Sequence, residues 1–146
     1  MNVIFLLTPK SDVAYIYDDF SMRQVLEKME YHRYTALPVI DREGLYIGTL
    51  TEGDLLWVIK NECSLNIRDA ERLLVKDIPR HTSNQALPIS TDLNDIVQMA
   101  LNQNFVPLVD DRGIFIGIVT RKNIIQYFYG IYSSLKAEER EAAGQD

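Results

Sequence analysis

Side chains that build catalytic and metal sites are scarce in this sequence. Cys63 is its single cysteine, and His32 and His81 are its two histidines. A lone cysteine cannot form an internal disulfide, and two histidines do not complete a metal cluster around it. We therefore expect Cys63 to be an unreactive side chain near a helix end. The sequence also lacks a Walker loop, a GxGxxG fingerprint and a nucleophile with an activating base, so it predicts a protein that is not an enzyme.

Basic charge and long hydrophobic runs are also in short supply. The 146 residues carry 15 lysines and arginines against 21 aspartates and glutamates, a formal net charge of -6. Unspecific nucleic-acid binders need a basic face, so we expect no nucleic-acid partner, although a local basic pocket for one phosphate ligand stays compatible with this charge. The apolar run 3–7 is too short to span a membrane and lacks the basic start of a signal peptide. These features predict a cytoplasmic protein without a membrane partner.

Two stretches of the sequence are close copies of each other. Residues 37–56 (LPVIDREGLYIGTLTEGDLL) align with residues 106–125 (VPLVDDRGIFIGIVTRKNII) at a constant offset of 106 − 37 = 69 positions. The coinciding pairs are Pro38 and Pro107, Asp41 and Asp110, Gly44 and Gly113, Ile47 and Ile116, Gly48 and Gly117, and Thr51 and Thr120. A period of this length indicates two copies of one structural unit, whose symmetry shapes the fold.

Each copy is predicted to contain strand, helix, strand, hairpin turn, strand and helix. In the first copy the apolar runs 13–16 and 37–40 indicate buried strands. Ser21 and Gln24 form a capping-box pattern that begins the helix between them. The turn 41–44 is followed by a strand over 45–50 and by a helix that begins after Thr51.

The second copy repeats this order with a small deletion. Its elements are a helix opened by Asp92, strands over 106–109 and 114–119, and a helix over 122–129. The first helices align at an offset of 71, so the second copy has lost two residues near Gln103 and Asn104. We therefore predict an α+β fold of two tandem β-α-β-β-α repeats that pack sheet to sheet with pseudo-twofold symmetry. The expected bounds are 1–62 and 86–132 for the repeats, 63–85 for a linker and 133–146 for a polar tail, which is either a fraying helix extension or disordered.

This combination of motifs resembles the CBS domain pair, also called a Bateman module. The motifs are a Pro-containing middle strand, a D-x-x-G hairpin, a strand with glycine and threonine, and a following T-x-x-D. The resemblance covers about 3–129, and it is closest to small stand-alone bacterial members. It implies adenosyl ligands (AMP, ADP, ATP, S-adenosylmethionine or cyclic di-AMP) in clefts between the repeats, and a homodimer in which two modules form a disc.

The tetrapeptide Thr51-Glu52-Gly53-Asp54 is the first candidate site. It lies where a strand passes into a helix, whose N-terminus offers free N–H groups and partial positive charge for a phosphate. The resemblance implies that Thr51 adds a hydroxyl donor and that Asp54 binds a ribose diol. The same pattern is also that of a capping box, in which Thr51 and Asp54 only begin the helix, and the two roles are compatible.

An apolar slot for adenine is implied by the same resemblance. Small side chains leave room for a ring, and strand backbone groups can read its polar edge. The residues assigned to this slot are Ala14, Tyr34, Thr35, Ala36 and Pro38, with Phe105 and Val106 in the second copy. The alternative is that these are ordinary core residues of the strands.

The second copy carries Thr120-Arg121-Lys122-Asn123 at the matching position. Asn123 lacks the charge that strengthens a contact to ribose, so this cleft is not expected to equal the first. Arg121 and Lys122 are cations at a helix N-terminus, where the helix dipole disfavours them. They either neutralise the phosphate of a ligand whose nucleoside lies at Asp54, or they form a solvated pair.

The function predicted from these features is a homodimeric adenine-nucleotide sensor that signals to an unidentified effector protein in trans. Aromatic residues of the last helix, among them Phe128 and Tyr132, fit a dimer contact. A cyclic di-AMP receptor is one alternative within the same class. A ligand-free interaction scaffold is another, and a small nucleotide hydrolase would require a general base that the sequence does not reveal.

Overall fold

The first half of the chain forms a three-stranded sheet covered by helices. The computed structural model describes residues 2–62, 66–81 and 83–144, so the expectation for Cys63 lies outside the described residues. The sheet has the order β2-β3-β4, with β2 at Ile16–Tyr17, β3 at Ala36–Ile40 and β4 at Tyr46–Thr51. Helix α1 (Met22–His32) begins at Ser21, where both hydrogen bonds of the predicted capping box are present. Helix α2 (Glu52–Asn61) follows β4 directly.

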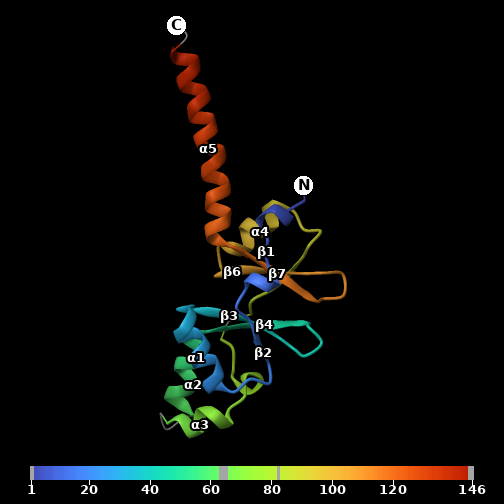
Figure 1. Cartoon of the computed structure of the whole chain (residues 1–146), viewed down its shortest axis with the longest axis vertical. Helices are drawn as coiled ribbons and strands as arrows, with labels where there is room; N and C mark the ends of the chain where they lie inside the picture. The colour runs from blue at the N-terminus through green and yellow to red at the C-terminus, as the bar shows by residue number, and fades with distance from the viewer. Residues whose placement is uncertain (1, 63–65, 82, 145–146) are drawn as a thin grey trace.

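The second half forms a four-stranded sheet with the order β1-β7-β6-β5. Its strands are β1 (Thr8–Pro9), β5 (Leu87–Pro88), β6 (Phe105–Val109) and β7 (Phe115–Thr120). Helix α4 (Leu93–Ala100) has eight residues against the eleven of α1, which is where the shortening of the second copy is found. The two sheets lie between the helices of the first half and those of the second (Figure 1). The predicted α+β class with two β-α-β-β-α repeats is confirmed.

The two hairpins meet at the junction of the halves. The backbone N–H of Tyr46 donates to the carbonyl of Gly113 at 3.2 Å, and that of Phe115 donates to the carbonyl of Gly44 at 2.9 Å. Both turn glycines have positive φ angles, 90° and 82°, which glycine adopts without steric cost. The reciprocal exchange is the local expression of the pseudo-twofold symmetry.

The N-terminal segment crosses from one half to the other. A 3-10 turn η1 (Ile4–Leu6) places Val3 and Leu6 in the hydrophobic core of the second half. Strand β1 then pairs antiparallel with β7, with Thr8 opposite Ile118. The chain returns through the 3-10 turn η2 (Lys10–Asp12) to β2. Within the predicted first repeat, residues 1–62, the segment 3–9 therefore contributes to the second sheet and core.

The predicted strand over 13–16 is wrong in extent. Only Ile16 and Tyr17 pair with β3, opposite Val39 and Ile40. Residues 13–15 are not part of a ladder, because here the chain passes from the second sheet to the first. Val13 and Ala14 face a cavity instead of a neighbouring strand.

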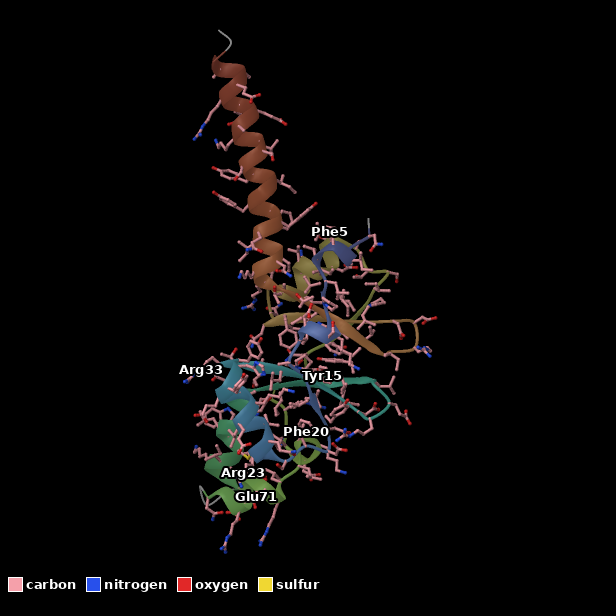
Figure 2. All side chains as sticks on the ribbon, viewed as in Figure 1. Phe5, Tyr15, Phe20, Arg23, Arg33 and Glu71 are labelled. Atoms are coloured by element: carbon pink, nitrogen blue, oxygen red, sulfur yellow. The ribbon has the colours of Figure 1, made fainter. Side chains whose placement is uncertain are left out.

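The predicted linker packs on the first half. Helix α3 (Ile67–Arg72) and the 3-10 turn η3 (Val75–Asp77) fall within the predicted linker. Val75 and Ile78 are buried in the first hydrophobic core. Arg23 of α1 also forms an ion pair with Glu71 of α3 (Figure 2).

Helix α5 (Arg121–Gly144) extends far beyond its predicted end at Tyr129. It projects from the body of the molecule, and the predicted tail from residue 133 is its outer half as far as residue 144 (Figure 1). Alanine, glutamate, lysine and arginine dominate this half, and these residues favour helix even without tertiary packing. None of the described helices contains an apolar stretch of the length that a membrane span requires.

Candidate functional site

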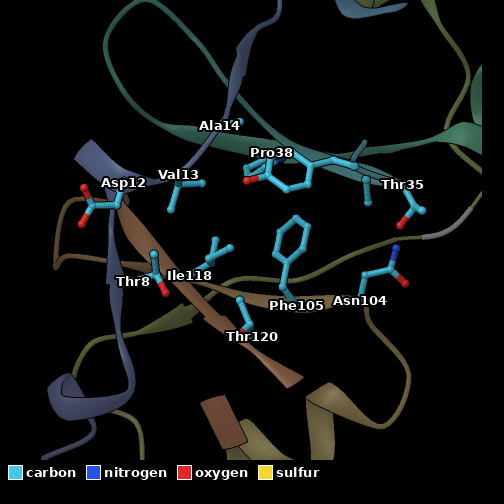
Figure 3. A pocket seen from close by; sticks show the side chains of 12 residues that line it. Thr8, Asp12, Val13, Ala14, Thr35, Pro38, Asn104, Phe105, Ile118 and Thr120 are labelled. Atoms are coloured by element: carbon cyan, nitrogen blue, oxygen red, sulfur yellow. The ribbon is translucent and has the colours of Figure 1, made fainter. Parts of the chain in front are cut away.

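A cavity of about 260 Å³ lies between the two halves (Figure 3). It is lined by Thr8, Asp12, Val13, Ala14, Tyr34, Thr35, Ala36, Pro38, Asn104, Phe105, Ile118 and Thr120. Pockets for drug-sized molecules have volumes of roughly 300–1,000 Å³. This cavity lies just below that range, so it is sized for a single nucleoside rather than a larger ligand. Seven of the predicted site residues meet here, namely Ala14, Tyr34, Thr35, Ala36, Pro38, Phe105 and Thr120.

Three walls from separate parts of the chain enclose this cavity. The first is β3 with the two residues before it, where Ala36 and Pro38 are buried strand residues. The second is the crossing segment from Thr8 to Ala14. The third comes from β6 and β7 and presents Phe105 and Thr120. Figure 3 shows Phe105 directed into the space between Pro38 and Thr120.

Tyr34 is held at the cavity by a stacked histidine. Arg33, the residue that follows helix α1, has a left-handed backbone (φ 59°) that reverses the chain. The rings of His32 and Tyr34 then lie parallel, with an interplanar angle of 5° and centroids 5.2 Å apart. Tyr34 remains 45% exposed, so one part of its surface lies toward solvent while the residue lines the cavity. An aromatic side chain in this position suits stacking with a purine base.

In the second tetrapeptide, Thr120 lines the cavity, whereas the Asn123 side chain binds the N-terminal segment. The hydroxyl oxygen of Thr120 accepts from the backbone N–H of Asn123 at 3.1 Å, which caps α5. The Asn123 side-chain amide donates to the carbonyl of Leu6 at 3.2 Å and to the hydroxyl of Thr8 at 3.3 Å. It therefore fastens the crossing segment to the first turn of α5.

The first tetrapeptide has both halves of a capping box. The hydroxyl of Thr51 accepts from the N–H of Asp54 at 3.2 Å, and the Asp54 carboxylate accepts from the N–H of Thr51 at 3.0 Å. The other carboxylate oxygen accepts from the His81 backbone N–H at 2.9 Å, and it lies 3.2 Å from Nδ1 of that ring. Asp54 is 1% exposed and is not among the residues that line the cavity.

The electrostatics of Asp54 follow from this environment. Burial acts to raise the pKa of its carboxyl group, but the backbone N–H groups of His81 and Thr51, with their side-chain contacts, together outweigh burial. The pKa of Asp54 therefore lies below its ordinary value. The carboxylate is ionised at neutral pH and is already satisfied by hydrogen bonds.

The remaining predicted residues lie away from the cavity. Arg121 donates from Nε to the carbonyl of Ala100 at 2.9 Å, across the groove between α4 and α5. Lys122 is exposed, and Val106 is fully buried in the second core. This placement separates the adenine slot from Asp54 and joins it to Thr120, which differs from the arrangement expected from the sequence.

Five lining residues were not among the predicted site residues, namely Thr8, Asp12, Val13, Asn104 and Ile118. Val13 was expected only as a strand residue, and one of the other four had a signal in the sequence. Ile118 lies two positions before Thr120 on the same strand, so period-two alternation places both on one face. No sequence signal marked Thr8, Asp12 and Asn104 as lining residues, because their position depends on the crossing segment and on the loop before β6. Over the described chain, no three His, Cys, Asp or Glu side chains converge to hold a metal ion.

Comparison with known proteins gives a consistent result. The model of the CBS domain matches this chain twice, at residues 6–61 and 75–130. The CBS domain-containing protein CBSX2 of Arabidopsis thaliana is 25% identical over 143 residues, which cover 82% of this chain and 60% of that protein. This chain therefore spans less than two thirds of that relative.

Solved structures share the same architecture. The structure of CbpB in complex with cyclic di-AMP superposes with a TM-score of 0.83 at 22% identity, and covers 94% of this chain and 91% of that one. The structure of CBSX2 in complex with AMP has a TM-score of 0.73 at 28% identity, with 90% and 98% covered. CbpB of Listeria monocytogenes in complex with cyclic di-AMP has a TM-score of 0.78 at 21% identity, with 92% and 99% covered.

Proposed function

This chain belongs to the CBS domain family, and we propose that it is a regulatory module that binds an adenine nucleotide in the cavity between its two repeats. The observation that carries the proposal is the cavity itself, which brings the predicted adenine slot of the first repeat together with Thr120 of the second. Its volume of about 260 Å³ suits one nucleoside. The solved complex of CBSX2 with AMP supports this ligand class.

The walls suggest how each part of such a ligand is held. The purine base would enter the slot beside Ala14 and Ala36, with Tyr34 and Phe105 as apolar and aromatic contacts. The phosphate would lie at Thr120, where the first N–H groups of α5 and the helix dipole favour an anion. Asn123 would act indirectly, since its amide holds Leu6 and Thr8 in place.

A regulatory output requires that ligand prefer one arrangement of the protein over another. The cavity is bounded by both halves and by the crossing segment, so a ligand contacts all three at once. A change in their relative position would alter its affinity and would be transmitted to α5 through Asn123. We propose no catalytic step, and the effector is a separate protein in the cytoplasm.

A homodimer completes this proposal. The outward side chains Ile125, Phe128, Tyr132 and Leu135 are 67%, 43%, 57% and 54% exposed. They recur at intervals of three and four residues along α5, the spacing of a helix face that packs on another helix. Sedimentation equilibrium should give twice the chain mass, and a monomeric mass would contradict the dimer.

Cyclic di-AMP is the second candidate ligand. The solved CbpB complexes with this dinucleotide favour it. Its two adenosine units exceed a cavity sized for one, so the second unit would lie outside, near the exposed Tyr34. The alternative function is that of a ligand-free interaction scaffold. The Thr51 tetrapeptide favours it, since the Asp54 carboxylate is occupied by hydrogen bonds within the protein.

Calorimetry and thermal unfolding with AMP, ADP, ATP, S-adenosylmethionine and cyclic di-AMP test the proposal. A ligand at about 100 times its dissociation constant should add roughly 2.7 kcal/mol to the free energy of unfolding. Ala14→Leu should fill the slot and abolish the shift. Ala142→Leu, the same change on the exposed end of α5, should preserve it. If no compound binds the wild-type protein, the scaffold reading replaces the sensor.

A further inference from the structure

We propose that Asp12 makes the cavity selective for charge, so that adenosine compounds with few phosphates bind better than di- and triphosphates. This inference rests on the proposed function and narrows its ligand class. Asp12 is the one charged side chain among the twelve residues that line the cavity. It stands at one edge of the cavity, opposite the side where Thr35 and Asn104 lie (Figure 3).

The charge of Asp12 is not neutralised by its neighbours. Over the described chain, no Lys, Arg or His nitrogen lies within 4.0 Å of its carboxylate. Lys10 is on the same 3-10 turn, but its ammonium lies over the ring of Tyr15, 5.1 Å from the centroid. Lys28 lies over the same ring at 5.6 Å and donates to the Tyr15 carbonyl. Both cations are thus directed to Tyr15 rather than to Asp12.

The cations of the second tetrapeptide do not reach the cavity either. Arg121 is bound to the carbonyl of Ala100 in a different groove, and neither it nor the exposed Lys122 lines the site. What remains for an anion is Thr120 and the first turn of α5. A helix N-terminus carries only about half a positive charge, enough to favour one phosphate group. Further phosphates would find no cation in the cavity to compensate them, and its one charged side chain is the acid Asp12.

The other tetrapeptide has the opposite surroundings. Arg80 lies with its guanidinium over Gly48, at 2.9 Å from where a Cβ would stand, and His81 contacts Asp54. Arg80 thus lies beside Gly48 and His81 beside Asp54 in the first half, whereas the cavity at Thr120 is lined by an acid. The charge preference follows from this chain's own side chains.

Solvent limits the size of the effect. Asp12 is exposed, so its repulsion of a phosphate is screened by water and by salt over about 10 Å at 0.1 M ionic strength. Each added phosphate should therefore weaken binding by about two- to fivefold, or roughly tenfold between AMP and ATP. The ratio should shrink as salt is raised.

Calorimetric titrations with AMP, ADP and ATP, in EDTA to keep divalent cations away, test the inference on the full chain. The variants are Asp12→Asn and Asp12→Lys, with Asp111→Asn as the control, because Asp111 is an exposed acid outside the cavity. We expect the wild type to bind AMP about tenfold more tightly than ATP. Asp12→Asn should narrow that ratio and Asp12→Lys should reverse it, whereas Asp111→Asn should leave it unchanged.

The outcomes separate this inference from the proposed function. Binding of AMP with a ratio that does not change in the Asp12 variants overturns the charge selection and leaves the sensor intact. Equal or tighter binding of ATP by the wild type does the same. Failure of every compound to bind overturns both proposals. Circular dichroism and the melting temperature of each variant verify that a lost affinity is not lost folding.

Discussion

The two tetrapeptides occupy the same place in each repeat, and each uses its fourth residue to hold a segment that arrives from elsewhere. Asp54 accepts from the backbone N–H of His81, whereas Asn123 donates to the backbone carbonyl of Leu6. An acid suits the first because its partner is a donor, and an amide suits the second because its partner is an acceptor. The difference between Asp and Asn therefore matches the polarity of the partner. Asn123 is not a weakened copy of Asp54.

The paired glycines show the same contrast in steric terms. A Cβ on Gly117 would clash with the carbonyl oxygen of Thr8, and the φ of 155° at Gly117 is one that L-residues rarely adopt. A Cβ on Gly48 would meet only the far end of the Arg80 side chain, at 2.9 Å. One glycine makes room for backbone and the other for a flexible side chain.

Gly117→Ala should give the largest effect. The added methyl group forces β1 away from β7, so we expect a loss of about 3 kcal/mol in the free energy of unfolding and loss of ligand binding. Gly48→Ala should cost less than about 1 kcal/mol, because the Arg80 guanidinium can move aside. Urea unfolding measures both. Equal losses would show that the crossing segment does not depend on the close approach at Gly117.

Substitutions of Asn123, the fourth residue of the second tetrapeptide, should have the next largest effect on the free energy of unfolding. Asn123→Asp puts a carboxylate against the carbonyl of Leu6, and we expect a loss of about 2 kcal/mol in the free energy of unfolding. Asn123→Ala removes the donor without adding charge and should cost about half as much. An Asp variant as stable as the wild type would mean that the amide does not fasten the segment.

The dependence on pH should be the smallest effect. Because the pKa of Asp54 is lower in the folded protein than its ordinary value near 3.8, its ionised form contributes stability above that value. This contribution is lost as the pH falls through the folded pKa. The advantage of wild type over Asp54→Asn in melting temperature should shrink between about pH 6 and pH 3. Asp111→Asn is the control for net charge, and a constant difference would contradict the prediction.

Local features were predictable from the sequence, and long-range ones were not. The capping box at Ser21, the turns at Gly44 and Gly113 and the paired strands follow from residues close together in the chain. The apolar run 3–7 indicates that these residues are buried, but it does not indicate which core they join. The pairing of the N-terminal segment with β7 was therefore not predicted. The sequence analysis therefore combined the adenine slot with Asp54, whereas in the structure the crossing segment and Thr120 line the same cavity as the slot. The outer half of α5 was ambiguous because it packs against no other described element.

The crossing of the N-terminal segment has a consequence for how the chain is made. Thr8 pairs with Ile118, 118 − 8 = 110 positions later in the sequence. During synthesis on the ribosome, the apolar side chains of Val3 and Leu6 therefore cannot be buried in the second core until β7 has emerged. Closing so long a loop is slow compared with forming either hairpin. The wall of the cavity is among the last parts to assemble, so only chains synthesised beyond β7 acquire the ligand site.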